Sequence, residues 1–174
     1  MRLILLRHAK SEKAEPDMRD RDRPLTARGQ KDALQVDAYL VHHELLPDRV
    51  IVSPARRTRE TWERLAAALP KPAPVRYDDG LYNASQAAII EAIKGAPRTA
   101  QTLLVIGHNP GLHDAARLLV ASGDVEARER LNEGLPTAGL VVIDFAGNDW
   151  GKVHPHGGRL ERFLHPRVRM GSTD

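Results

Sequence analysis

The sequence has no cysteine, few aromatic residues and no long hydrophobic run. Without cysteine, a chain of 174 residues cannot build a disulfide framework, a thiolate nucleophile or a zinc site with sulfur ligands. Its apolar runs, such as Leu3–Leu6 and Leu103–Ile106, are far shorter than the ~20 residues of a membrane helix. The first run ends at Arg7, too early for the ~7–15-residue core of a secretory signal peptide. We therefore expect a soluble, cytoplasmic protein that does not bind membranes.

Aromatic residues make up only 4% of the chain, whereas Lys and Arg outnumber Asp and Glu by 26 to 23. A sequence pI near 9.4 and an arginine surplus suit a partner that carries oxyanions, either nucleic acid or a phosphorylated molecule. A nucleic-acid-binding module is disfavoured, because no aromatic residues are interleaved with the basic clusters to stack on bases. The length predicts one domain, expected over residues 1–165, with a loose tail at 166–174.

Short aliphatic strands alternate with stretches of helical spacing. Continuous apolar runs predict buried parallel strands at Leu3–Leu6, Arg49–Val52 and Thr102–Ile106. Four apolar stripes predict the core faces of helices: Leu34, Ala38, Val41 and Leu45; Ala55, Thr58, Trp62, Leu65 and Leu69; Ile89, Ala92 and Ile93; and Leu112, Ala115 or Ala116, and Leu119. The alternation predicts an α/β domain, a three-layer sandwich with a mainly parallel central sheet and helices on both faces.

Capping residues predict where these helices begin and end. The expected N-caps are Thr26, Ser53, Ser85 and Asn109, and proline follows two of them at the first helical position. Glycine is expected to end the third and fourth helices, at Gly95 and Gly123. The remainder predicts a short charged helix at 125–133, a strand at 140–145 and an edge strand at 157–163.

Cationic and imidazole side chains follow three of the predicted strands. The segments after the strands are Arg7-His8-Ala9-Lys10-Ser11, Ser53-Pro54-Ala55-Arg56-Arg57-Thr58-Arg59 and Gly107-His108-Asn109-Pro110-Gly111. Ligands of parallel sheets bind outside the carboxyl ends of the strands, so we expect these segments to meet. A dianion there gains the Arg7 and Arg56 guanidinium groups and the helix starts at Ser53 and Asn109.

Histidine adds a nucleophile to this predicted anion site. Imidazole has an unperturbed pKa near 6.5, and neighbouring arginines disfavour its protonated form, which keeps one ring nitrogen free to attack. Phosphoryl transfer mainly needs positioning and stabilisation of charge on the oxygens, which two arginines and two histidines supply without a metal. The sequence therefore favours phosphoryl chemistry.

The three segments, in this order, resemble the motifs of the histidine phosphatase superfamily, also called phosphoglycerate-mutase-like. Leu25-Thr26-Ala27-Arg28-Gly29 also matches the helix opening of that family, and the resemblance extends to Thr137-Ala138. It implies that His8 is the nucleophile that becomes phosphohistidine. It also implies that Arg7, Arg56 and His108, with Ser53 and Asn109, bind the phosphoryl group, and that no metal or organic cofactor is needed.

The small size of the chain and Ala9, at a position where many members have glycine, resemble the SixA-like phosphohistidine phosphatases. The implied substrate is phosphohistidine on a signalling or phosphocarrier protein, so the expected role lies in signal transduction. The alternative is a small-molecule phosphomonoester. A pseudoenzyme that binds phosphate groups without turnover is a further alternative, and the oligomeric state is left open.

One departure from the family concerns the general acid. Many members place a glutamate after the third strand, where this chain reads Asp78-Asp79-Gly80-Leu81-Tyr82-Asn83. Asn83 cannot release a proton, so either Asp78 or Asp79 is the acid or no strong acid is needed. The second option fits a phosphoramidate, whose leaving nitrogen requires less help than the oxygen of an ester.

Other polar residues allow more than one interpretation. Lys10 and Ser11 are expected rim contacts, and Arg57 and Arg59 are interpreted as solvated residues or ion-pair partners. The 12–25 loop is interpreted as a mobile charged loop or as a cover of the site; it alternates Asp17, Asp20 and Asp22 with Arg19, Arg21 and Arg23. A competing hypothesis is a metal hydrolase that uses His113, His154 or His156, whereas His42-His43-Glu44 lacks the spacing of a metal site.

Overall fold

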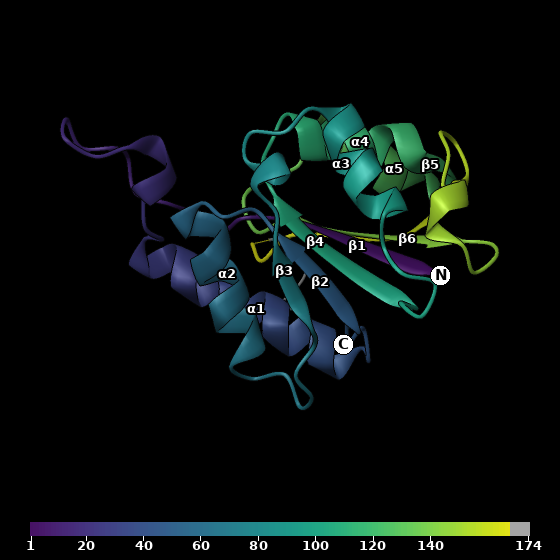
Figure 1. The fold of residues 1–174 in the computed structure, drawn as a ribbon, viewed down its shortest axis with the longest axis horizontal. Helices are drawn as coiled ribbons and strands as arrows, with labels where there is room; N and C mark the ends of the chain where they lie inside the picture. The colour runs from purple at the N-terminus through teal and green to yellow at the C-terminus, as the bar shows by residue number, and fades with distance from the viewer. Residues whose placement is uncertain (168–174) are drawn as a thin grey trace.

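The computed structural model describes residues 1–167, in which seven strands form one sheet with helices on both faces (Figure 1). The strands are β1 (Arg2–Arg7), β2 (Arg49–Val52), β3 (Val75–Tyr77), β4 (Thr102–Gly107), β5 (Val120–Gly123), β6 (Leu140–Phe145) and β7 (Gly158–Leu164). The helices are α1 (Ala27–His42), α2 (Arg56–Ala66), α3 (Gln86–Lys94), α4 (Gly111–Leu119) and α5 (Val125–Glu133). Three single-turn helices are η1 (Asp20–Asp22), η2 (Asp79–Leu81) and η3 (Trp150–Lys152). The predicted α/β three-layer sandwich is confirmed.

The order of the strands brings many loops to one edge of the sheet. That order is β3-β2-β4-β1-β6-β7-β5, with β1 to β4 mutually parallel and β6 antiparallel to β1 and β7. Arg7 is opposite Gly107, Leu6 is opposite Leu140, and Leu140 is opposite Leu164. The carboxyl ends of β1, β2 and β4 therefore share an edge with the start of β6 and the end of β7.

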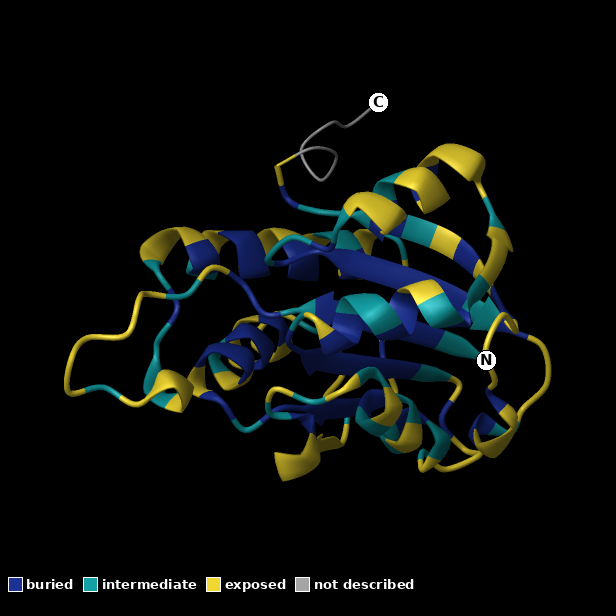
Figure 2. Ribbon diagram, turned by 90° about the horizontal axis from the view of Figure 1, so that it is seen from above, coloured by how far each residue is buried: buried dark blue, intermediate teal, exposed yellow. Residues whose placement is uncertain are grey.

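Two apolar cores lie on the two faces of the sheet. Successive side chains of a strand point to opposite faces, so Leu3 and Leu5 pack with α3, α4 and α5, whereas Ile4 and Leu6 pack with α1 and α2. Figure 2 shows buried central strands between helices whose outward faces are exposed. No helix of the described chain is both long and apolar enough to cross a membrane. The predicted loose tail falls largely on residues 168–174, which lie outside the described range.

Two of the four predicted N-caps are confirmed. The side chains of Thr26 and Ser85 accept hydrogen bonds from the backbone of α1 and α3. The predictions for Ser53 and Asn109 are wrong, because α2 begins only at Arg56 and α4 at Gly111. Both side chains are used elsewhere: Ser53 Oγ bonds to a histidine, and Asn109 Nδ2 donates to a backbone carbonyl.

The predicted apolar stripe of α1 is also wrong. Leu34 and Val41 are 46% and 38% exposed, and the helix buries a different face that includes two carboxylates, Asp32 and Asp37. The reason lies at Gly29, where an added Cβ would stand 2.1 Å from the Lys10 carbonyl oxygen. The buried face carries a second apolar stripe, Ala33, Val36 and Leu40, and the glycine packs this face against the loop after β1.

The third and fourth helices end differently from each other. Gly95 is the C-cap of α3, as predicted, but α4 stops at Leu119 and continues directly into β5. Gly123 ends this short strand with a φ of +128°, where an added Cβ would lie 2.4 Å from the Leu160 carbonyl oxygen.

The predicted helix at 125–133 and strand at 140–145 are confirmed. The last strand is not at the edge, because β5 pairs with its outer side.

Candidate active site

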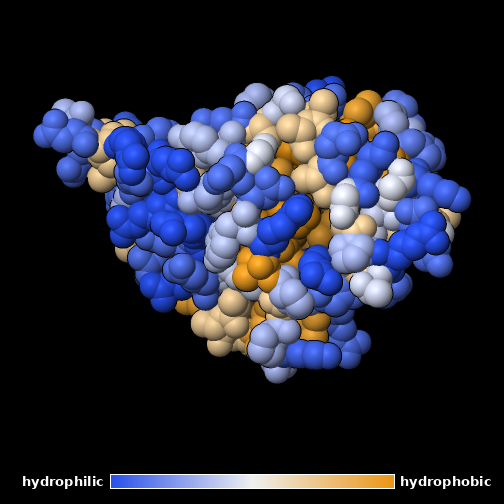
Figure 3. Space-filling view, in the orientation of Figure 1, coloured by the Kyte–Doolittle hydropathy of each residue, from blue (hydrophilic) through white to orange (hydrophobic). Residues whose placement is uncertain are grey.

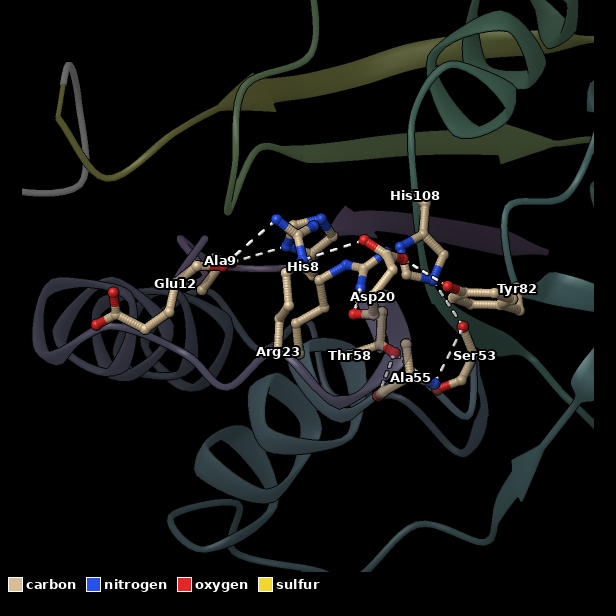
Figure 4. Close-up of polar contacts among 11 residues, drawn as sticks. His8, Ala9, Glu12, Asp20, Arg23, Ser53, Ala55, Thr58, Tyr82 and His108 are labelled. Atoms are coloured by element: carbon tan, nitrogen blue, oxygen red, sulfur yellow. Dashed lines mark hydrogen bonds and ion pairs between the residues drawn. The ribbon is translucent and has the colours of Figure 1, made fainter. Parts of the chain in front are cut away.

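His8 and His108 form a buried pair at the edge of the sheet where β1 and β4 end. Their ring centroids are 5.4 Å apart, and the residues are only 7% and 3% exposed. The parallel register places them together, because Arg7 is opposite Gly107 and each histidine follows one of these residues. Figure 4 shows both rings beside Asp20, Tyr82 and Ser53.

The hydrogen bond of His8 fixes which ring nitrogen carries the lone pair. Nδ1 lies 2.7 Å from the Ala9 carbonyl oxygen. A carbonyl only accepts, so Nδ1 carries the hydrogen and the lone pair of the neutral ring is on Nε2. Burial, with smaller effects from His108, Arg57 and Arg7, lowers the pKa of His8 to about 3. The ring is therefore neutral at physiological pH, and burial contributes more to this than the neighbouring arginines.

His108 is held by a serine at the end of β2. Ser53 Oγ lies 2.7 Å from His108 Nε2, whereas Nδ1 is buried without a hydrogen-bond partner in the described chain. Burial, followed by the charge of Arg57, lowers the pKa of His108 to about 4, and Asp20 opposes this shift. A buried ring nitrogen without a partner is unusual, and a bound anion beside His8 would supply the missing hydrogen bond.

Arg7 lies between the histidine pair and the loop before β6. It is half-buried, and its Nη1 donates to the Leu135 carbonyl oxygen at 3.0 Å. Its Nε is buried and unpartnered among the described residues. Burial and the charge of Arg57 lower the pKa of Arg7, and Arg7 in turn lowers the pKa of both histidines. These observations place a cation with unused donors beside the rings.

The structure brings Arg57 to the histidines and turns Arg56 away. Arg57 is 3% exposed, and its charge contributes to the lowered pKa of both histidines. The side chain of Arg56 is 48% exposed and pairs with Glu60 at 2.7 Å. The interpretation of Arg57 as a solvated residue is therefore wrong, although it does form an ion pair. Arg59 is exposed, as expected.

The charged loop after β1 projects from the body and presents a mostly hydrophilic surface (Figures 1 and 3). Its η1 turn nevertheless reaches the site. The Asp20 carboxylate accepts hydrogen bonds from Tyr82 Oη and Arg57 and pairs with Arg23 at 3.1 Å. The Tyr82 ring is 5.7 Å from the His108 ring. These contacts bring Asp20 to the site, and a cover formed by the whole 12–25 loop remains a prediction.

The predicted acids Asp78 and Asp79 lie in the turn after β3. Asp78 accepts a hydrogen bond from Gly80 N and pairs with Arg76 at 3.3 Å, and Asp79 is exposed. Neither makes a described contact with the histidine pair. Asp20, from a different loop, is the carboxylate that affects His108. Sequence reasoning missed its position, because a loop of alternating charges does not reveal which member points inward.

The predicted rim contacts lie at the start of the same loop. Lys10 is exposed, and Ser11 is half-buried in a bridge with Leu25. The Lys10 carbonyl accepts hydrogen bonds from Thr26, which ties this loop to the start of α1. The two side chains lie next to the segment that holds His8, and their contact with a substrate remains a prediction.

Two buried threonines of α2 support the segments that follow β1 and β2. Thr61 Oγ1 accepts a hydrogen bond from Ala9 N, and Thr58 Oγ1 donates to the Ser53 carbonyl oxygen. Thr61 is at i+4 from Arg57 and at i+3 from Thr58, so it neighbours both on the helix surface, and one helix positions the segments after β1 and β2. That spacing was the available signal in the sequence for assigning Arg57 to the inner face.

The three histidines of the competing metal hypothesis, His113, His154 and His156, do not form a cluster in the described structure. His113 Nε2 bonds to the Leu131 carbonyl oxygen, and His154 and His156 are exposed on the connection to β7. Within residues 1–167 no group of three or more His, Cys, Asp or Glu side chains is arranged to hold a metal ion.

Comparison with known proteins agrees with this geometry. Residues 3–86 match the family described as the histidine phosphatase superfamily (branch 1). An uncharacterized protein of Mycobacterium tuberculosis is 36% identical over 165 residues, covering 93% of this chain and 100% of that protein.

Two similar solved structures carry the name "putative phosphohistidine phosphatase SixA". The one from Nakamurella multipartitia is 30% identical with a TM-score of 0.82, covering 96% of each chain. The one from Agrobacterium tumefaciens is 29% identical with a TM-score of 0.81, covering 95% of this chain and 97% of the other. The motifs, the buried histidine pair and these similarities together show that the chain is a SixA-like member of the histidine phosphatase superfamily.

Proposed function

We propose that this protein hydrolyses phosphohistidine on a partner protein through a covalent phosphohistidine at His8. The observation that carries the proposal is the tautomer of His8, in which the Ala9 carbonyl holds the Nδ1 hydrogen and the Nε2 lone pair faces a site rich in cations. Arg7, Arg57 and Arg23 all influence the histidine pair, and they supply the positive charge that a phosphoryl dianion requires.

In the first step, His8 Nε2 attacks the phosphorus atom. A new N–P bond forms as the bond from phosphorus to the substrate imidazole breaks, and that bond's electron pair stays on the leaving nitrogen. Arg7, Arg57 and His108 stabilise the charge on the three oxygens. The exposed Arg56 takes no part in this scheme, whereas Ser53 holds His108, and Asn109 holds the Leu135 carbonyl next to Arg7.

In the second step, water attacks the phosphorylated His8. The His8–phosphorus bond breaks, the ring recovers its Nε2 lone pair, and both protons of the water leave with dihydrogen phosphate. Because Nδ1 keeps its hydrogen throughout, His8 departs as a neutral imidazole rather than as an anion. The Ala9 carbonyl thus makes the same ring a good nucleophile and a good leaving group.

The acid–base groups near the site favour a phosphoramidate. Hydrogen bonding from Tyr82, and the charges of Arg57 and Arg23, lower the pKa of Asp20, which keeps it ionised and unsuited to donate a proton. An alkoxide leaving group needs such a proton. A phosphohistidine protonated on its second ring nitrogen leaves as neutral imidazole without one, so this site suits it better than an ester.

The proposal has three further parts. The reaction proceeds without a metal ion, the partner is a phosphocarrier or signalling domain, and the protein acts in cytoplasmic signal transduction. The sequence similarity to proteins named phosphohistidine phosphatases supports the substrate.

The test is a substrate panel: a phosphohistidine protein, phosphoimidazole, an aryl phosphate and a sugar phosphate, each with and without EDTA. We expect turnover of both phosphoramidates, weak turnover of the esters, and no effect of EDTA. His8→Ala should lose all activity, and acid-labile phosphate should appear on the wild type during turnover. Full activity of His8→Ala, or preference for the sugar phosphate, would overturn the proposal.

A further inference from the structure

Asp20 and Tyr82 form a partly exposed side of the site that holds the histidine pair. The Tyr82 hydroxyl donates a hydrogen bond to the Asp20 carboxylate, and the Tyr82 ring is 5.7 Å from the His108 ring. Both histidines are buried, whereas the Asp20 side chain is 49% exposed and Tyr82 is half-buried. Figure 4 shows Asp20 and Tyr82 pointing toward each other beside His108. The proposed chemistry assigns neither residue a contact with the substrate.

The leaving ring of a phosphohistidine substrate has to point toward this side. An in-line displacement expels the leaving nitrogen opposite the attacking atom, which is Nε2 of the buried His8. The expelled ring also belongs to a partner protein, which is too large to enter a site whose histidines are 7% and 3% exposed. The ring therefore departs toward solvent, on the side where Asp20 and Tyr82 lie.

Phosphohistidine carries opposite charges at its two ends. Its phosphoryl group is a dianion, and its ring is a cation when the second ring nitrogen is protonated. The arginines beside the histidines match the first charge, and Asp20 is placed to match the second. Hydrogen bonding from Tyr82 lowers the pKa of Asp20, so this carboxylate is ionised at neutral pH. The site thus combines cations for the phosphoryl group with one anion on its solvent side.

The Asp20 carboxylate has acceptor capacity that the described residues leave unused. Oδ2 accepts hydrogen bonds from Tyr82 Oη and Arg57 Nη2, and Oδ1 pairs with Arg23 Nε at 3.1 Å. An ionised carboxylate has about four lone-pair positions, so Oδ1 can accept from one more donor. The N–H of a protonated imidazole ring is such a donor.

The Tyr82 ring already contacts two flat cations. The Cζ atoms of Arg21 and Arg57 are 5.6 and 5.9 Å from the centre of the ring. Arg57 is buried and bonded to Asp20, whereas Arg21 is exposed and makes no ion pair within residues 1–167. Guanidinium and imidazolium are both planar, delocalised cations that aromatic faces attract. An imidazolium ring can therefore take the place of Arg21 on Tyr82.

We propose that Asp20 and Tyr82 bind the leaving ring of phosphohistidine, with the Asp20 carboxylate accepting the ring N–H and the Tyr82 face contacting the ring in place of Arg21. This inference rests on the proposed phosphohistidine phosphatase function and names the residues that select its substrate. When the bond to phosphorus breaks, its electron pair stays on the leaving nitrogen and the ring becomes neutral. The second ring nitrogen keeps its proton, so the hydrogen bond to Asp20 persists as the ring departs. The leaving group of an ester has neither this N–H nor a positive charge.

The test compares phosphoimidazole with an aryl phosphate, whose leaving oxygen carries no proton and no positive charge. The measured quantity is the ratio of kcat/KM for phosphoimidazole to kcat/KM for the aryl phosphate. We expect Asp20→Asn to lower this ratio about tenfold, because a hydrogen bond to a charged acceptor becomes one to a neutral amide. Turnover of the aryl phosphate should not fall, since the variant removes negative charge beside the phosphoryl group.

Asp22→Asn is the matched control for this substitution. It makes the same charge change in the same η1 turn, but Asp22 pairs with the exposed Arg19 at 2.9 Å and has no described contact with the histidines. It should leave the ratio unchanged.

Substitutions of Tyr82 test the ring contact separately. Tyr82→Leu should lower the ratio about fivefold, the scale of a contact between a cation and an aromatic face. Tyr82→Phe keeps the face and should lower the ratio less. Tyr77→Leu, at an exposed position of β3, is the control and should not change it. Thermal unfolding of each variant identifies any loss that arises from poor folding.

Two results for Asp20→Asn would refute the inference while leaving the phosphatase function intact. One is a ratio equal to that of the wild type. The other is an equal loss on both substrates, which would show that Asp20 only holds Arg57 in place. Equal ratios for Tyr82→Leu and Tyr82→Phe would refute the role of the ring. A wild type that does not hydrolyse phosphoimidazole would instead contradict the proposed function.

Discussion

Arg56 and Arg57 are adjacent in the sequence, but their side chains serve opposite environments. Arg56 lies in solvent and pairs with Glu60 at 2.7 Å, whereas Arg57 is buried and pairs with Asp20 at 3.2 Å. Successive residues of a helix are about 100° apart, so the two side chains leave the first turn of α2 in different directions, and only Arg57 is directed towards the histidines. Arg57 is the buried one of the two, on the side of α2 that also carries the buried Thr58 and Thr61.

Arg57→Lys is expected to reduce kcat/KM on phosphoimidazole by roughly 10- to 100-fold. A hydrogen bond to a charged group contributes about 1.5–3 kcal/mol, and an ammonium group cannot replace a bidentate guanidinium. Arg56→Lys is the matched control and should change kcat/KM less than threefold. Equal losses in both variants would refute this assignment. Thermal unfolding of the two variants checks that neither effect arises from misfolding.

Asp20→Asn should strengthen the binding of inorganic phosphate or vanadate. The Asp20 carboxylate now neutralises Arg57 and Arg23 near the site, and the amide keeps a hydrogen-bond acceptor for Tyr82 without the negative charge. We expect the inhibition constant for vanadate to fall about fivefold, the scale of one partly exposed charge pair. Asp79→Asn, at an exposed position, should leave it unchanged. Weaker vanadate inhibition of Asp20→Asn would mean that the carboxylate organises the site instead of competing for it.

Ser53→Ala should lower kcat by about 3- to 10-fold, because it removes a neutral hydrogen bond worth about 0.5–1.5 kcal/mol. The backbone contact from Thr58 remains, so the fold around β2 should persist. Nitrogen NMR shifts of His108 should change with the mutation, since Ser53 Oγ contacts Nε2. Unaltered His108 shifts would show that the serine does not control this ring.

The stability of the protein should decrease as the pH falls below 6.5. The pKa values of His8 and His108 are lowered in the folded state to about 3 and about 4. Below pH 6.5 the unfolded chain therefore binds more protons than the native state, and protonation favours unfolding. The full stability is present above pH 6.5 and is lost by ~1.4 kcal/mol per pH unit for each histidine as the pH falls towards these values.

Urea unfolding at pH 7 and pH 5 measures this effect. Replacing a buried histidine by a neutral residue removes its contribution, so His108→Gln should show a smaller difference between the two pH values than the wild type. His154→Gln, which changes an exposed ring, is the control. An identical pH dependence in wild type and His108→Gln would contradict the buried neutral histidine.

Much of the architecture and the centre of the site follow from local sequence. Continuous aliphatic runs predict β1, β2 and β4, because strands buried on both faces have no polar alternation. Parallel strands bring their following residues to one edge, and this alone predicts that Arg7, His8 and His108 meet. Thr26 and Ser85 were identifiable as caps because their hydroxyl groups satisfy nearby backbone donors.

Tertiary packing decided what local spacing left open. Ser53 and Asn109 resemble helix caps, but their side chains bond across the site to His108 and Leu135. The buried face of α1 depends on the approach of the Lys10 carbonyl to Gly29, a contact between distant segments.

The positions of the arginines were likewise determined in part by the sequence and in part by tertiary packing. Composition and strand order determined that cations would gather at this edge of the sheet, where we propose that a phosphoryl dianion binds. Which cations do so was decided by the facing of α2, by the return of Asp20 to Arg57 and by the Leu135 carbonyl that orients Arg7. A long side chain can point to either side of its backbone, and only the neighbours packed around it select one.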